Sequence, residues 1–89
     1  MKAISAKEIV INWIKSKSKE AIPVFYSYDF EEKIVIYGRL VHQKSHTAST
    51  YSRGFRDIRS SNTLSKHGLK LEEINHKNGK VKGWKINIL

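Results

Sequence analysis

The stretch from residue 47 to residue 58 reads TASTYSRGFRDI and has the pattern of one amphipathic helix. Thr47 is a residue type that accepts a hydrogen bond from a free backbone N–H at a helix start. Tyr51, Phe55 and Ile58 follow at intervals of four and three residues, so they share one side of a helix. The stretch therefore predicts a helix with an apolar back in the core and a cationic, hydroxyl-bearing front in solvent.

The residues that follow predict a β-hairpin. The polar run 60–63 favours a loop, so the helix should span about 47–59. Beyond it, apolar residues alternate with polar ones on both sides of a turn: Leu69, Leu71, Trp84, Ile86 and Ile88. Asn78-Gly79 suits the positive φ angles of a type I′ turn, which predicts two antiparallel strands over about 69–88. Because Ile74 breaks the alternation, we expect a bulge or a twist there.

Residues 5–17 predict a first helix. Ser5 and Glu8 have the spacing of a capping box, in which the serine oxygen accepts an N–H of the first turn. Ile4 and Ile9 have the spacing of a hydrophobic staple across the same cap. Further apolar residues recur at helical spacing: Val10, Trp13 and Ile14. This apolar face is expected in the core.

The middle of the chain carries two shorter patterns. Residues 24–26 are β-branched or aromatic and are consistent with a short strand. Asp29 and Glu32 repeat the capping-box spacing, so a second helix is predicted at about 29–42. The β-branched run 34–36 makes a strand the rival prediction for that segment. Together the elements predict an α+β fold in which three helices are followed by a C-terminal hairpin that packs on them.

The charge of the chain points to an anionic partner. Its 89 residues, expected to form one domain, carry 17 Lys and Arg against 8 Asp and Glu, a net charge of +9. Residues 1–44 hold eight basic and five acidic residues, whereas residues 45–89 hold nine and three. The excess therefore lies mainly in the second half, and a strongly basic domain is a candidate nucleic-acid binder.

The composition also argues against several other classes of protein. There is no cysteine, which excludes disulfides, thiolate catalysis and cysteine-ligated zinc. No apolar run approaches the roughly 20 residues that span a bilayer, so we expect a cytoplasmic protein with no membrane partner, nucleoid-associated if bacterial or archaeal. No phosphate-binding glycine loop or paired acid motif is present, so we expect neither an enzyme nor a cofactor.

Residues 47–58 resemble the recognition helix of helix-turn-helix DNA-binding proteins. In that family a capping Ser or Thr precedes a small residue, Ser-Thr, an apolar residue, Ser-Arg and two later apolar residues. With the hairpin, the region 29–88 resembles a winged-helix domain, which implies sequence-specific binding of double-stranded DNA by a small transcriptional regulator. Because one helix reads few base pairs, a homodimer is expected.

The resemblance assigns roles to ten residues. Those expected to face base edges in the major groove are Ser49, Ser52, Arg53 and Arg56. Those expected to hold phosphates are Thr47 and Thr50. Those expected at the wing tip 77–82, on the backbone or minor groove, are Lys77, Asn78, Lys80 and Lys82.

Other interpretations of the same residues stay open. The arginines could form a solvated helix face with Asp57 as a local ion-pair partner. The domain could be a protein-interaction module of winged-helix fold, or an RNA or single-strand binder that uses its aromatic residues. His42 and His46 have the i, i+4 spacing of a metal pair, but we expect exposed loop histidines and no metal site.

Overall fold

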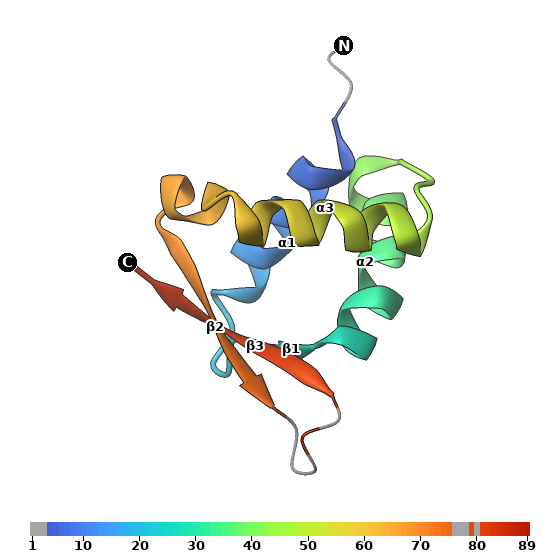
Figure 1. Ribbon diagram of the computed structural model, residues 1–89. Coiled ribbons are helices and arrows are strands. Elements are labelled where there is room, and N and C mark those ends of the chain that lie inside the picture. The colour runs from blue at the N-terminus through green and yellow to red at the C-terminus, as the bar shows by residue number, and fades with distance from the viewer. Residues whose placement is uncertain (1–3, 76–78, 80) are drawn as a thin grey trace.

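Three helices and a three-stranded antiparallel sheet make up the computed structural model, which describes residues 4–75, 79 and 81–89 (Figure 1). In chain order the elements are α1 (Ala6–Lys17), β1 (Val24–Tyr26), α2 (Ser27–His42), α3 (Ala48–Ser60), the short 3-10 helix η1 (Thr63–His67), β2 (Leu69–Asn75) and β3 (Lys82–Ile88). This arrangement confirms the predicted α+β fold, including the short strand, and has a winged-helix-like layout.

Two of the three predicted helix starts are confirmed by their caps. The Glu8 backbone N–H donates to Ser5 Oγ at 3.2 Å, and the Thr50 N–H donates to Thr47 Oγ1 at 3.3 Å. The predicted capping box at Asp29 is wrong. The helix begins two residues earlier because β1 runs directly into it, which leaves Asp29 within the first turn. An acidic side chain still favours the positive end of the helix dipole there.

The sheet has the strand order β1-β3-β2, so β3 is central. The β2–β3 pairs run without interruption from Leu69 opposite Ile88 to Asn75 opposite Lys82, so the predicted bulge at Ile74 is wrong. Ile74 lies on the outer face of the sheet, opposite Gly83, which itself pairs with Tyr26 on β1. The apolar side chain at position 74 therefore lies on the other face from Leu69 and Leu71, while the pairing of the two strands stays in register.

The core lies between the inner face of the sheet and the helices, and aromatic rings occupy its centre. Trp13, Phe25, Phe30, Phe55 and Trp84 come from α1, β1, α2, α3 and β3 and are all buried. The Phe30 and Phe55 rings stack with centroids 4.7 Å apart, and Phe55 meets Trp84 edge-on at 4.8 Å. Within the described residues, no helix is long and apolar enough to cross a membrane.

Two buried glycines lie where helices cross. A Cβ atom on Gly38 of α2 would collide with the hydroxyl and ring of Tyr51 on α3. A Cβ atom on Gly54 of α3 would lie 3.5 Å from the backbone nitrogen of Lys7 on α1, which is an ordinary contact distance. Gly38 is therefore required by the packing of α2 against α3, whereas the site of Gly54 has room for a methyl group.

Alanine substitution should separate these two glycines. Gly54→Ala should keep or raise the free energy of unfolding, by up to about 1 kcal/mol, because alanine favours a helix. Gly38→Ala should lower it by about 1–3 kcal/mol, since the methyl group displaces Tyr51. Urea denaturation of both variants measures the difference. Equal stabilisation by both would contradict the packing of Tyr51 over Gly38.

Candidate nucleic-acid interface

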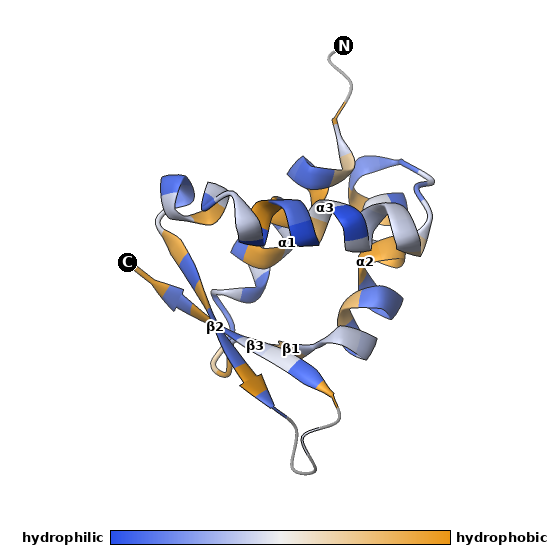
Figure 2. Cartoon of the chain, viewed as in Figure 1, coloured by the Kyte–Doolittle hydropathy of each residue, from blue (hydrophilic) through white to orange (hydrophobic). Residues whose placement is uncertain are grey.

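Helix α3 has the two faces that its sequence predicts. Tyr51, Gly54, Phe55 and Ile58 are buried against the other helices and the sheet. Figure 2 shows hydrophilic residues along the visible side of α3. The exposed or half-buried residues on its polar side are Ser49, Thr50, Ser52, Arg53, Arg56 and Arg59. The predicted orientation of Arg53 and Arg56 toward solvent is confirmed.

The residues predicted to face base edges share one hollow. Ser49, Ser52, Arg53 and Arg56 line a surface depression of about 590 Å³ together with Ala48 and with Glu31 of α2. Small side chains from the first turns of α3 and long arginines from its middle thus border the same space. A surface of this shape can approach a groove closely through its small residues and reach hydrogen-bond acceptors through its arginines.

The hydroxyls at the start of α3 form a local cluster. Thr47 Oγ1 lies 2.9 Å from Thr50 Oγ1 and 3.4 Å from Ser49 Oγ, besides accepting the capping bond from the Thr50 N–H. A hydroxyl oxygen can accept such a bond and still donate its own proton. Thr47 therefore has a structural role as the cap in addition to any contact with a phosphate.

The arginines of α3 are not neutralised by Asp57. The Asp57 carboxylate turns to α1 instead, where Lys7 Nζ lies 3.5 Å from its Oδ2 atom. Among the described residues, no carboxylate lies within 4.0 Å of the Arg53 or Arg56 guanidinium. The interpretation of Asp57 as their ion-pair partner is therefore wrong, and both positive charges remain available to an external anion.

Arg59 extends the cationic line of α3, although sequence reasoning did not select it. Its guanidinium carbon lies 4.5 Å from the Phe55 ring centroid and 4.8 Å from that of Trp84. Burial is the main cause that lowers the pKa of Arg59 from its usual value, partly offset by the charge of Glu73. The spacing of three residues from Arg56 was the available signal, but the stacking depends on strand β3.

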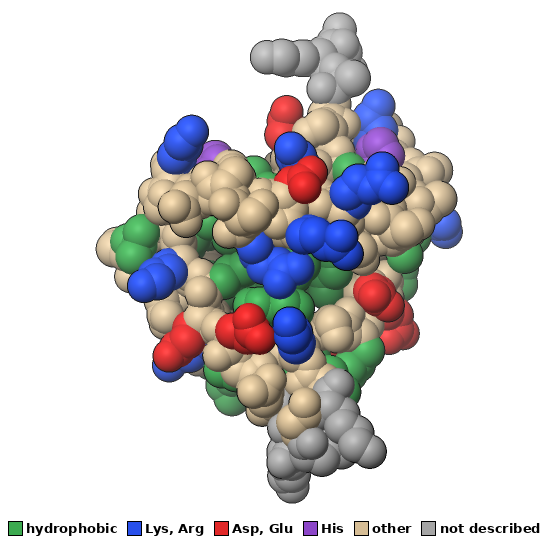
Figure 3. All heavy atoms as spheres, in the orientation of Figure 1, with side chains coloured by type: hydrophobic (Ala, Val, Ile, Leu, Met, Phe, Trp, Pro, Cys, Tyr) green, Lys and Arg blue, Asp and Glu red, His purple; other side chains and the backbone are tan. Residues whose placement is uncertain are grey.

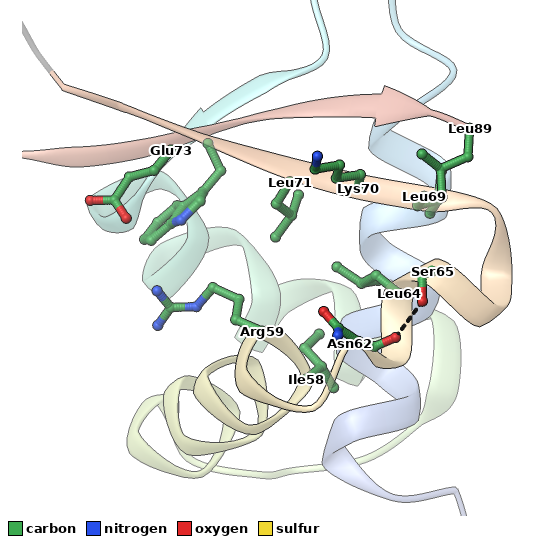
Figure 4. A pocket seen from close by; sticks show the side chains of 11 residues that line it. Ile58, Arg59, Asn62, Leu64, Ser65, Leu69, Lys70, Leu71, Glu73 and Leu89 are labelled. Atoms are coloured by element: carbon green, nitrogen blue, oxygen red, sulfur yellow. Dashed lines mark hydrogen bonds between the residues drawn. The ribbon is translucent and has the colours of Figure 1, made fainter.

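Arg59 borders a second depression, of about 500 Å³, between α3, η1 and β2. In Figure 4 its side chain reaches from α3 toward the strands, on the side of Glu73, while Leu64, Leu69 and Leu71 form an apolar part farther along. Arg59 thus lines this second depression, while Arg53 and Arg56 of the same helix line the first. Figure 3 shows Lys and Arg side chains gathered across the middle of this face.

Of the wing residues, only Lys82 can be placed. It opens β3, is exposed, and its Nζ lies 3.7 Å from Glu73 Oε1 on the neighbouring strand. Lys77, Asn78 and Lys80 lie outside the described residues. Strands β2 and β3, which form the hairpin, lie below α3 in Figure 1, and Lys82 does not line the hollow that contains Arg53.

The paired histidines are not the exposed loop residues that the sequence suggested. His42 and His46 are half-buried, and their Nε2 atoms and the Tyr51 hydroxyl are buried without a hydrogen-bond partner among the described residues. The His42 ring meets Tyr37 and the His46 ring meets Tyr51, both edge-on. They pack the α2–α3 connection, and burial raises the pKa of both tyrosines.

No group of three or more potential metal ligands occurs within the described part of the chain. Comparison with known protein families, curated proteins and solved structures finds no significant match to this sequence.

The cap of α3 should have a measurable effect on stability. Thr47→Ala removes the acceptor of the Thr50 N–H and should lower the free energy of unfolding by about 1 kcal/mol. Ser49→Ala removes a neighbouring hydroxyl outside the capping bond and should change stability much less. Thermal denaturation of the two variants compares them, and equal losses would show that the cap is not the stabilising interaction.

Proposed function

We propose that this chain is a winged-helix protein that binds double-stranded DNA in a sequence-specific manner, as a small transcriptional regulator. Helix α3 enters the major groove, and the wing tip 77–82 contacts the adjacent backbone. The observation that carries the proposal is the pair of exposed arginines, Arg53 and Arg56. They have no carboxylate partner among the described residues, and they line a hollow that is also lined by small hydroxyl residues.

The chemistry of this surface supports a duplex as the ligand. A major groove admits one α-helix, and arginine donates two hydrogen bonds to the O6 and N7 atoms of guanine. Serine hydroxyls can contact either bases or phosphates. Arg59, held against Phe55 and Trp84, is suited to a phosphate between the recognition helix and the wing.

Such a protein would regulate transcription by occupying a site on the DNA. A chain that reads DNA through one helix blocks another protein from the same base pairs, and a two-fold dimer would double the length of the site. We therefore propose a homodimer on DNA, and the cytoplasm, with its nucleoid where there is one, as its location.

Arginine substitutions test the role of α3. Arg53→Ala should weaken binding to a selected duplex by about 1–3 kcal/mol and relax the preference at one or two positions. Arg39→Ala removes the same charge from an exposed site on α2 outside the hollow, so it should weaken binding less and leave the preference unchanged. Fluorescence anisotropy with selected and scrambled duplexes measures both effects. Identical losses would indicate a purely electrostatic contribution.

Salt titration tests the class of ligand. Duplex affinity should fall with salt with a log–log slope of about −0.9 for each phosphate neutralised. Lys82→Ala should reduce the slope and weaken all duplexes alike, because a wing contact to the backbone carries no sequence information. Absent or salt-independent duplex binding would refute the proposal. Tighter binding to single strands would favour the single-strand alternative, and retention of an acidic protein partner alone would favour an interaction module.

A further inference from the structure

Among the residues that the structure describes, Glu31 is the one acidic residue that lines the hollow on α3. It lies in the first turns of α2, is exposed, and lines the hollow opposite residues that are otherwise small, hydroxyl-bearing or cationic. It makes no ion pair with any other described residue. A free carboxylate therefore shares the space in which Arg53 and Arg56 are free cations.

This carboxylate restricts what can enter the hollow. A phosphate would meet a like charge at close range, which is unfavourable where water is partly displaced. A base edge that offers an amino group would instead donate a hydrogen bond to Glu31. In the major groove, the pairing that carboxylates make is with the N4 amino group of cytosine.

We propose that Glu31 is a specificity-determining residue, which accepts a hydrogen bond from a cytosine amino group and keeps phosphates out of the hollow. The inference rests on the proposed duplex binding and deepens it. Because Arg53 and Arg56 select guanine acceptors from the same space, the site read by α3 should contain guanine and cytosine at neighbouring positions. The repulsion of phosphates also fixes the register, since only base edges fit opposite the carboxylate.

Glu32 provides a matched control for the experiment. It is the next residue on α2 and is exposed, but it does not line the hollow. Glu31→Ala and Glu32→Ala each remove one carboxylate, and with it one negative charge and its hydrogen-bond acceptors, from an exposed position on α2. Any general gain of affinity from the higher net charge should therefore be common to both variants.

The experiment is selection from a random duplex library with the wild-type chain and the two variants, followed by anisotropy on selected and scrambled duplexes. Wild type should select a cytosine at a fixed position beside a guanine. Glu31→Ala removes the acceptor, so it should lose that cytosine and reduce the ratio of selected to scrambled affinity by about ten-fold or more. Glu32→Ala should keep both the selected cytosine and the affinity ratio.

The outcomes separate this inference from the proposed function. If wild type binds duplexes selectively but the two variants behave alike, or if Glu31→Ala keeps the cytosine, the role of Glu31 is refuted and duplex binding stands. If wild type binds no duplex at all, both proposals fail together.

Discussion

The fold depends on the contact of five aromatic rings, each contributed by a different element. Phe25 of β1 lies at the centre of the group, with its ring centroid 5.0 Å from that of Trp13 and 5.6 Å from that of Trp84. Phe30 and Phe55 extend the group to α2 and α3. Aromatic pairs of this kind each stabilise by about 0.5–1.5 kcal/mol beyond the burial of their area. The group ties the sheet to all three helices and thereby fixes the orientation of α3.

The polar face of α3 is a consequence of that constraint. Because Tyr51, Phe55 and Ile58 are all buried, helical geometry leaves Ser49, Arg53 and Arg56 no position except the outer side. The Lys7–Asp57 pair then draws the acidic residue of α3 toward α1. The surface is cationic both because of the arginines it presents and because its own acid is engaged elsewhere.

Local patterns predicted the parts of the structure that local physics controls. The caps at Ser5 and Thr47, the stripe on α3 and the paired strands all depend on neighbouring residues or on simple periodicity. The start of α2 was misplaced because it depends on the strand that precedes it. Ile74 was misjudged because a change of apolar face along a strand does not reveal whether the pairing with the neighbouring strand is interrupted, and here it continues opposite Gly83.

The candidate functional surface was predicted only in part, because some of its residues are placed by tertiary contacts that local sequence patterns do not contain. The residues of α3 that face the hollow could be identified within one helix, but Glu31 reaches it from α2 and Arg59 is positioned by Trp84 of β3. Such contributions depend on tertiary contacts between residues far apart in sequence. A capping-box spacing at Asp29 and Glu32 gave no indication that the residue between them, Glu31, borders α3.

The stacking of Arg59 gives the surface an uneven stiffness. A free arginine side chain loses up to about 2 kcal/mol of rotamer entropy when it is ordered, and the contact of the Arg59 guanidinium with Phe55 and Trp84 means that part of this cost is met on folding. Arg53 and Arg56 are still to be ordered when a ligand arrives. The end of the surface near the sheet is thus preorganised, while the end near α2 can adapt to the shape of what it meets.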